Sequence, residues 1–247
     1  MKIFIEKNYE LLSSKAVLRF KKILESKKVK NIAFPTGNTP KLFYRKLVEL
    51  YKKGKIDFSK ISGFLIDEYY PMKKDSKDSF NYYISNNFFA LVNLKEKYSL
   101  NGSNLDFISE CRSYKELIEK KGGLDMAILG IGENGHIGFN EPGSELNSRV
   151  RLVELKNTTL DLNRAKYEAG PIPRYALTMG IYEIFRAKRI MLLASGKSKS
   201  ERVWDFLNGP ISRDLPVSVL RLHPDIEVII DKEAAVLIED KIMNLIN

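Results

Sequence analysis

The sequence predicts an α/β fold in which a mostly parallel sheet is covered by helices on both faces. Three observations predict it: short apolar runs recur along the chain, turn-rich loops follow them, and amphipathic helical patterns follow the loops. Unbroken apolar strands that alternate with helices are typical of parallel sheets buried on both sides. Because no low-complexity linker, repeat or change of composition divides the chain, we expect a single domain over residues 1–247.

The strands are expected where the apolar runs lie, and the helices where apolar residues recur at helical spacing. Ser113 and Glu116 fit a capping box at the start of one helix, and Gly122 is expected to end it. The expected strands are 31–34, 61–66, 124–130, 189–195 and 226–230. The expected helices are 9–26, 41–51, 79–92, 113–121, 200–207 and 232–245.

Composition excludes several classes of protein. The single cysteine, Cys111, cannot form an intramolecular disulfide, and the first residues lack the apolar segment of a secretion signal, so we expect a cytoplasmic protein. No run approaches the roughly 18 apolar residues of a membrane span. The net charge of +10 suggests an anionic partner. Its lysines alternate with apolar helix positions, however, and no basic stripe with interleaved aromatics indicates nucleic-acid binding.

The loop "PTGNTP" precedes a helix and resembles an anion site. Thr39 can cap the helix, Pro40 fits its first turn, and Thr36, Gly37 and Asn38 lie in the loop just before it. Amides at a helix N-terminus point outward, and the helix dipole favours negative charge there. An ordinary strand-to-helix turn is the alternative interpretation.

Two further loops carry charge at the ends of expected strands. Lys197 and Lys199 lie where a helix begins, a position unfavourable for cations unless an anion compensates, although both can simply point into water. Asp67 and Glu68 follow the strand 61–66. Since adjacent residues point to opposite sides of a strand, only one of them is expected to face a site. Turn-forming acids are the alternative.

The loop "GIGENGHIGFNEPGS" carries the richest chemistry. His136 stands among glycines, with Asn134 and Glu141 close by in sequence. Histidine titrates near neutrality and suits proton transfer, and Glu141 could orient the imidazole and stabilise its charged form. One histidine and one acid without cysteines do not form a zinc site, so no metal is expected. The other histidine, His223, is interpreted as structural.

The same loop resembles the signature of the glucosamine-6-phosphate deaminase family. The segments "PTGNTP", "IDEYY", "RYALTMGIYEIFRAKRIMLLASGKSK" and "VSVLRLHPD" resemble that family's segments in the same order, from about residue 30 to 231. The "FNEP" continuation favours this branch over the related 6-phosphogluconolactonases. The resemblance implies a modified Rossmann-like fold, a small amino-sugar phosphate as the binding partner, and no metal or organic cofactor.

The family isomerises and deaminates glucosamine 6-phosphate to fructose 6-phosphate and ammonia. On this chain the resemblance implies that His136 moves the proton that opens the sugar ring, supported by Glu141 and Asn134. It implies that Asp67 carries a proton from C2 to C1. The phosphate is then expected against the amides of Thr36, Gly37, Asn38 and Thr39 with Lys199 as its cation, and Gly130 near the sugar.

Two departures from the family pattern stand out. Many members have an acid where this chain has Asn134, and the family's phosphate-binding arginine would fall at Ala165, flanked by Arg164 and Lys166. Either flanking cation could take its place. The chain is also shorter than the hexameric members, so allosteric control by an N-acetylated sugar phosphate is not expected. A homo-oligomer is compatible with the sequence, which contains no feature that fixes the oligomeric state.

Three alternative functions stay open at this stage. Galactosamine 6-phosphate differs from glucosamine 6-phosphate only at the C4 hydroxyl, and no motif reads that position. Lactone hydrolysis would use His136 to activate water, but the lactonase pattern is missing around "FNEP". A catalytically inactive sugar-phosphate sensor would have no need of a base at C2, which disfavours it.

Overall fold

The computed structural model describes residues 1–25, 28–164, 167 and 172–238, and its frame is a parallel sheet. Within these residues seven strands pair in parallel in the order β1-β10-β9-β6-β2-β3-β5. The predicted α/β class is therefore confirmed. The strands are β1 (Lys2–Glu6), β10 (Ile226–Asp231), β9 (Ile190–Ala194), β6 (Met126–Gly130), β2 (Asn31–Phe34), β3 (Ser62–Leu65) and β5 (Glu96–Tyr98).

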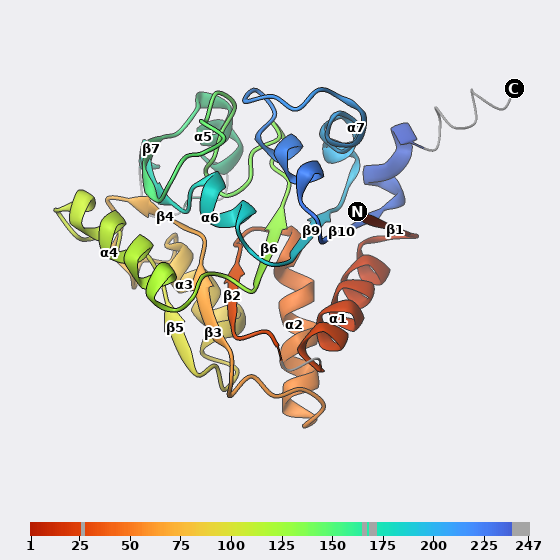
Figure 1. Cartoon of the computed structure of the whole chain (residues 1–247), viewed down its shortest axis with the longest axis horizontal. Helices are drawn as coiled ribbons and strands as arrows, with labels where there is room; N and C mark the ends of the chain where they lie inside the picture. Colours follow the sequence, from red (N-terminus) through yellow and green to blue (C-terminus); the bar gives the residue numbers. More distant parts are fainter. Residues whose placement is uncertain (26–27, 165–166, 168–171, 239–247) are drawn as a thin grey trace, which may run out of the picture.

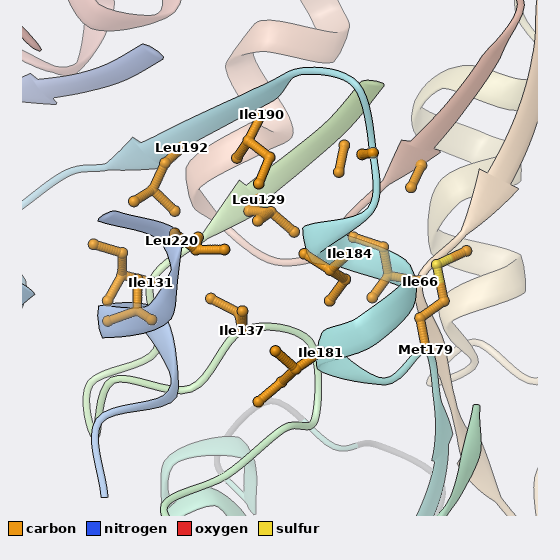
Figure 2. Packing of buried hydrophobic residues seen from close by; sticks show 14 of the residues in the cluster. Ile66, Leu129, Ile131, Ile137, Met179, Ile181, Ile184, Ile190, Leu192 and Leu220 are labelled. Carbon is orange, nitrogen blue, oxygen red and sulfur yellow. The ribbon is translucent and has the colours of Figure 1, made fainter. Parts of the chain in front are cut away.

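Helices cover both faces of this sheet, as predicted. Figure 1 shows α1 (Tyr9–Glu25) and α2 (Thr39–Lys52) on one side of the central strands, with α6 (Ile181–Phe185) and α7 (Ser200–Asn208) on the other. Alternation along β6 explains the two layers: Met126 and Ile128 pack in the core beneath α1 and α2, and Ala127 and Leu129 pack in the opposite core. Figure 2 shows part of the second core, where Leu129, Ile190 and Leu192 meet Ile184 of α6.

A second, antiparallel sheet was not predicted. It has the order β4-β8-β7 and consists of β4 (Asp67–Tyr70), β8 (Tyr175–Thr178) and β7 (Arg151–Glu154). Asp67 and Glu68 therefore do not form a turn after a strand, because they begin β4. Ile66 joins the two sheets: its N–H donates to Phe34 O of the large sheet at 3.2 Å, and its carbonyl accepts from Met179 N at 2.8 Å.

Some predicted helix boundaries are wrong. Helix α4 (Phe107–Lys120) begins six residues before Ser113, and Asp106 caps it by accepting from Ser109 N at 2.9 Å, so the capping box does not form. The chain does leave this helix at Gly122, whose φ is +86°. Asn38 rather than Thr39 occupies the N-cap of α2, and its side chain makes no capping hydrogen bond.

The remaining elements agree with the expectations or extend them. The helix expected over 79–92 consists of α3 (Phe80–Ile84) and the π-helical turn η1 (Ser85–Phe89). Residues 232–238 are helical, and the rest of that expected helix lies outside the described residues. Helix α5 (Asn157–Arg164) and the 3₁₀ turns η2 (Lys197–Lys199) and η3 (Pro216–Leu222) complete the described elements. In the part of the chain described, every helix is too short or too polar to cross a bilayer.

Candidate active site

A pocket of about 330 Å³ opens at the carboxyl ends of β2, β3, β6 and β9. In parallel sheets this edge gathers the loops that bind ligands. A larger groove of about 720 Å³ beside α2 contains no histidine and no buried acid, so the chemistry indicates the smaller pocket. The pocket is lined by eight of the ten predicted site residues: Thr36, Gly37, Asn38, Thr39, Asp67, Gly130, His136 and Lys199.

Other lining residues were not predicted. Phe80 and Phe139 stack at 5.5 Å between ring centroids and form an aromatic wall of the pocket. Thr159 contributes a buried hydroxyl from α5. Only Ser195 had a usable signal, since it ends the apolar run 189–195.

The histidine loop is anchored by two isoleucines. Ile131 and Ile137 flank it, and both point into the buried core in Figure 2. Gly132 N donates to His136 O at 2.9 Å and closes the loop. A Cβ at Gly132 would lie 2.3 Å from the imidazole, which real contacts essentially never show. The ring therefore packs directly on the Gly132 backbone, and glycine is required there.

Asn134 connects His136 to Glu141. Asn134 Oδ1 lies 2.7 Å from His136 Nδ1 and accepts from His136 N at 3.2 Å, while Asn134 Nδ2 donates to Glu141 Oε2 at 3.3 Å. Because an amide oxygen only accepts, Nδ1 carries the proton and Nε2 keeps its lone pair. Glu141 thus contacts Asn134 rather than the imidazole, and neither residue lines the pocket, so its predicted support of the ring stays a prediction that would operate through Asn134.

The imidazole is neutral at physiological pH. Burial, with a smaller contribution from the positive charge of Lys199, lowers the pKa of His136 to about 4. The expectation that this histidine titrates near neutrality is therefore wrong. A neutral ring with a free Nε2 lone pair can accept a proton from a bound ligand. Burial also raises the pKa of Glu141.

Introducing a charge at position 134 should raise the pKa of His136. In Asn134→Asp a carboxylate replaces the amide oxygen beside Nδ1, and a neighbouring opposite charge typically shifts a pKa by about 1 to 3 units. NMR titration of the ring should show this rise. Asn147→Asp adds the same charge at an exposed position of the following loop and should leave the pKa unchanged. Equal ring pKa values in wild type and Asn134→Asp would contradict the described contact.

Asp67 is a buried acid that none of the described residues hydrogen-bonds. Its side chain is 6% exposed, and Oδ1 is buried with no hydrogen-bond partner among the described residues. Burial, followed by the negative charge of Glu68, raises the pKa of Asp67 to about 8. A carboxylate with such a pKa is a strong base by carboxylate standards, and it lines the pocket.

Glu68 points away from the pocket, as the alternation of a strand predicts. It accepts hydrogen bonds from Ser79 Oγ, Asn81 Nδ2 and the N–H groups of Tyr69, Phe80 and Asn81 at 2.6–2.9 Å. The backbone N–H groups at the start of α3 thus find their acceptors in the two side-chain oxygens of Glu68. Its charge lies next to Asp67 without entering the pocket.

Lys199 is the cation of the pocket. Its side chain is 16% exposed and lies 3.7 Å from Glu133. The turn that carries it is held by Asp231, which accepts from Ser195 Oγ and from Gly196 N. Lys197 is exposed and does not line the pocket, so only one of the two predicted lysines faces it.

Three further expectations concern residues away from the pocket. Arg164 is exposed, lies 3.5 Å from Asp161 and does not line the pocket, and Lys166 lies outside the described residues. His223 is structural, as predicted: it is buried, and Nε2 lies 2.7 Å from Ala187 O. Among the described residues no group of acids, histidines and cysteines is arranged to bind a metal ion.

Comparison with known proteins gives matches over nearly the whole chain. The family described as glucosamine-6-phosphate isomerases/6-phosphogluconolactonase matches residues 7–229. A glucosamine-6-phosphate deaminase from Thermoanaerobacter pseudethanolicus is 44% identical over 244 residues, 98% of this chain and 96% of that protein. Another from Alkaliphilus metalliredigens is 43% identical over 246 residues, 97% of this chain and 100% of that protein.

Solved structures agree. A monomeric glucosamine-6-phosphate deaminase has a TM-score of 0.92 at 40% identity, covering 96% of this chain and 100% of that one. The 6-phosphogluconolactonase of Trypanosoma brucei has a TM-score of 0.74 at 20% identity, covering 95% of this chain and 97% of that one, and shows a shared fold. The chain thus belongs to the glucosamine-6-phosphate isomerase/6-phosphogluconolactonase family.

Proposed function

We propose that this protein is a cytoplasmic enzyme that isomerises and deaminates glucosamine 6-phosphate to fructose 6-phosphate and ammonia. One observation carries the proposal: a single pocket combines a buried base, a neutral imidazole and a cation beside an open helix N-terminus. Those groups match the needs of a phosphorylated sugar that must open, lose a carbon-bound proton and regain it. Relatives of 43–44% identity that bear the deaminase name support the assignment.

His136 opens the ring in this proposal. The free Nε2 takes the proton of the anomeric hydroxyl and returns a proton to the ring oxygen as the C1–O bond to that oxygen breaks, leaving the C1 aldehyde. The lowered pKa keeps the imidazole neutral before the reaction, so Nε2 is free to accept the proton, and the ring returns to neutral afterwards. Asn134 keeps Nδ1 protonated and so aims the basic nitrogen at the sugar.

Asp67 carries the proton between carbons. Its carboxylate takes the proton from C2 while the C1 oxygen gains a proton from the neighbouring ammonium group, which yields an enolamine. The carboxyl group of Asp67 then delivers its proton to C1. The product is an imine at C2, which water hydrolyses to the ketone with release of ammonia. A general base works best with a pKa near the working pH, and the raised pKa of Asp67 meets that condition.

The ammonia assay decides the function. Purified protein should release ammonia from glucosamine 6-phosphate, with galactosamine 6-phosphate and the two N-acetylated sugars measured side by side. Fructose 6-phosphate should appear in equal amount. A faster reaction with galactosamine 6-phosphate would reassign the substrate, and no ammonia from either amino sugar would overturn the proposal.

Removing the cation should weaken substrate binding more than it slows chemistry. In Lys199→Ala the phosphate loses a charge-assisted hydrogen bond of about 1.5 to 3 kcal/mol, so KM should rise about 10- to 150-fold. The phosphate is remote from the reacting carbons, so kcat should change little. Steady-state kinetics measure both constants. The exposed Lys197→Ala is the matched control, and a loss confined to kcat in Lys199→Ala would contradict this role.

A further inference from the structure

Tyrosine hydroxyls donate hydrogen bonds to backbone carbonyls of the loop that precedes α2. Tyr44 of α2 donates its hydroxyl hydrogen to Pro35 O at 2.6 Å. Tyr83 of α3 donates to Gly37 O at 2.5 Å. These two tyrosines come from different helices, and neither lines the pocket.

A third hydroxyl completes the set from another direction. Tyr9 is the first residue of α1, and its hydroxyl lies 2.8 Å from Asn38 O and 3.0 Å from Thr39 O. The same oxygen accepts from Leu42 N at 3.0 Å. The Tyr9 hydroxyl thus donates to the two carbonyls at the start of α2 and accepts from one backbone N–H of its first turn.

These contacts also fix the direction in which the backbone N–H groups of the loop point. In a trans peptide the carbonyl of one residue and the N–H of the next point in opposite directions. Because tyrosines that do not line the pocket hold the carbonyls of residues 35, 37 and 38, the N–H groups of Thr36, Asn38 and Thr39 point away from those tyrosines. These three residues line the pocket.

The loop has the properties of a preformed anion cradle. Across the described ranges, the N–H groups of residues 36–39 donate to no protein acceptor. Gly37 has a φ of +105°, which favours glycine and allows the backbone to turn between the Tyr83 and Tyr9 contacts. Burial raises the pKa of Tyr44, so its hydroxyl remains a neutral donor at all working pH values.

We propose that Tyr9, Tyr44 and Tyr83 are positioning residues that aim the amides of this loop at the phosphate of the substrate. The proposal rests on the proposed function for the identity of the phosphate ester, but its geometry requires only an anion in the pocket. Without the hydroxyls the loop would have to be ordered by the ligand itself, and binding would weaken by the cost of that ordering.

Tyr83→Phe and Tyr9→Phe test the proposal, alone and combined. Tyr44→Phe is less suitable, because Tyr44 is fully buried and the loss of its hydroxyl leaves Pro35 O without this hydrogen bond, which endangers folding. The probe is inorganic phosphate, whose dissociation constant is measured by calorimetry on the full chain. Tyr83→Phe removes one hydrogen bond, and Tyr9→Phe removes the three made by its hydroxyl. Phosphate should bind about 2- to 12-fold more weakly to each variant, and KM should rise in parallel while kcat stays within about twofold.

Tyr82→Phe is the matched control. It removes an exposed hydroxyl next to Tyr83 on the same helix, and no hydrogen bond of that hydroxyl is seen among the described residues. Its phosphate affinity should equal that of the wild type. Melting temperatures measured on the same preparations separate loop positioning from general loss of stability.

The outcomes separate this proposal from the proposed function. Unchanged phosphate affinity in the Tyr9 and Tyr83 double variant, in an enzyme that releases ammonia, would overturn the positioning role alone. A wild-type protein that binds phosphate but releases no ammonia would overturn the function, while weaker phosphate binding in the double variant would still support the positioning role. Equal losses of kcat and phosphate affinity would show a general structural role and contradict the proposal.

Discussion

Asp67→Asn should abolish ammonia release and at the same time make the folded protein more stable at neutral pH. The activity falls because asparagine keeps the shape of the side chain but cannot accept the proton from C2. Removing a general base typically costs about 10²- to 10⁴-fold in rate. Solvent deuterium should also disappear from C1 of the product during residual turnover in heavy water.

The gain of stability follows from the pKa of Asp67. The folded state raises this pKa from 3.8 to about 8, so the folded protein holds a proton that the unfolded chain releases between these two values. The free energy of unfolding therefore falls as pH rises from about 4 to 8, by up to about 4 kcal/mol at pH 7. Burying an unpaired amide costs about 1 to 3 kcal/mol. The net gain should be about 1 to 3 kcal/mol.

Thermal unfolding from pH 4 to pH 8 measures this effect. Each kcal/mol should raise the Tm of Asp67→Asn by about 2 to 4 °C at neutral pH. Near pH 4 folded Asp67 is protonated, so only the cost of the buried amide remains and the variant should be the less stable protein. Asp57→Asn is the control, and its effect on Tm should have the opposite sign. Hydrogen bonds from Ser59 and Asn93 lower the pKa of this exposed acid, so its replacement should not stabilise the protein as pH rises. A stable Asp67→Asn variant with near-native turnover would refute the assignment of Asp67 as the base.

His136→Gln should reduce turnover of the closed sugar by about 10²- to 10⁴-fold, the usual contribution of an acid–base residue. An open-chain analogue of the aldehyde bypasses ring opening and should lose much less. Rates on the two compounds, measured with the same preparation, isolate the step. Equal losses on both would show that His136 acts beyond ring opening.

The pH dependence of stability supplies an independent readout for the same variant. The folded state lowers the pKa of His136 from 6.5 to about 4, so the unfolded chain binds a proton that the folded protein excludes. Wild-type stability should therefore fall as pH drops from about 6.5 toward 4, by up to about 3 kcal/mol from this residue. In His136→Gln the free energy of unfolding should lack this part of its decrease between pH 6.5 and 4. An unchanged slope would contradict the burial of the imidazole.

Five strands of the large sheet were readable because they are short apolar runs. The edge strands β1 and β5 were not predicted, since β1 is partly exposed and β5 reads Glu-Lys-Tyr. The small sheet was not, since β7 reads Arg-Leu-Val-Glu and carries neither a long apolar run nor a turn signal. The start of α4 was missed because two residues, Asp106 and Ser113, can each cap a helix, and only packing selects between them.

The site was predictable where it depends on the ends of parallel strands. Asp67, His136 and Lys199 follow three different apolar runs, and the topology brings those ends together. The role of Asn134 as a link to Glu141 depends on the folded turn and has no local signal. The tyrosine contacts are equally hidden, since Tyr9 and Tyr83 are separated by 29 and 46 residues from the carbonyls they hold.

The residues that line the pocket come from both sheets, which meet at Ile66. In the proposed mechanism the phosphate-binding loop after β2, Lys199 and His136 all follow strands of the large sheet, whereas the base Asp67 begins the small sheet. Ile66 lies between the two sheets along the chain and hydrogen-bonds to Phe34 on one side and to Met179 on the other. Substitutions in the small sheet can therefore change the proton transfer at carbon while the phosphate-binding loop and Lys199 stay in place, which makes that sheet the place to redesign this scaffold for other sugar phosphates.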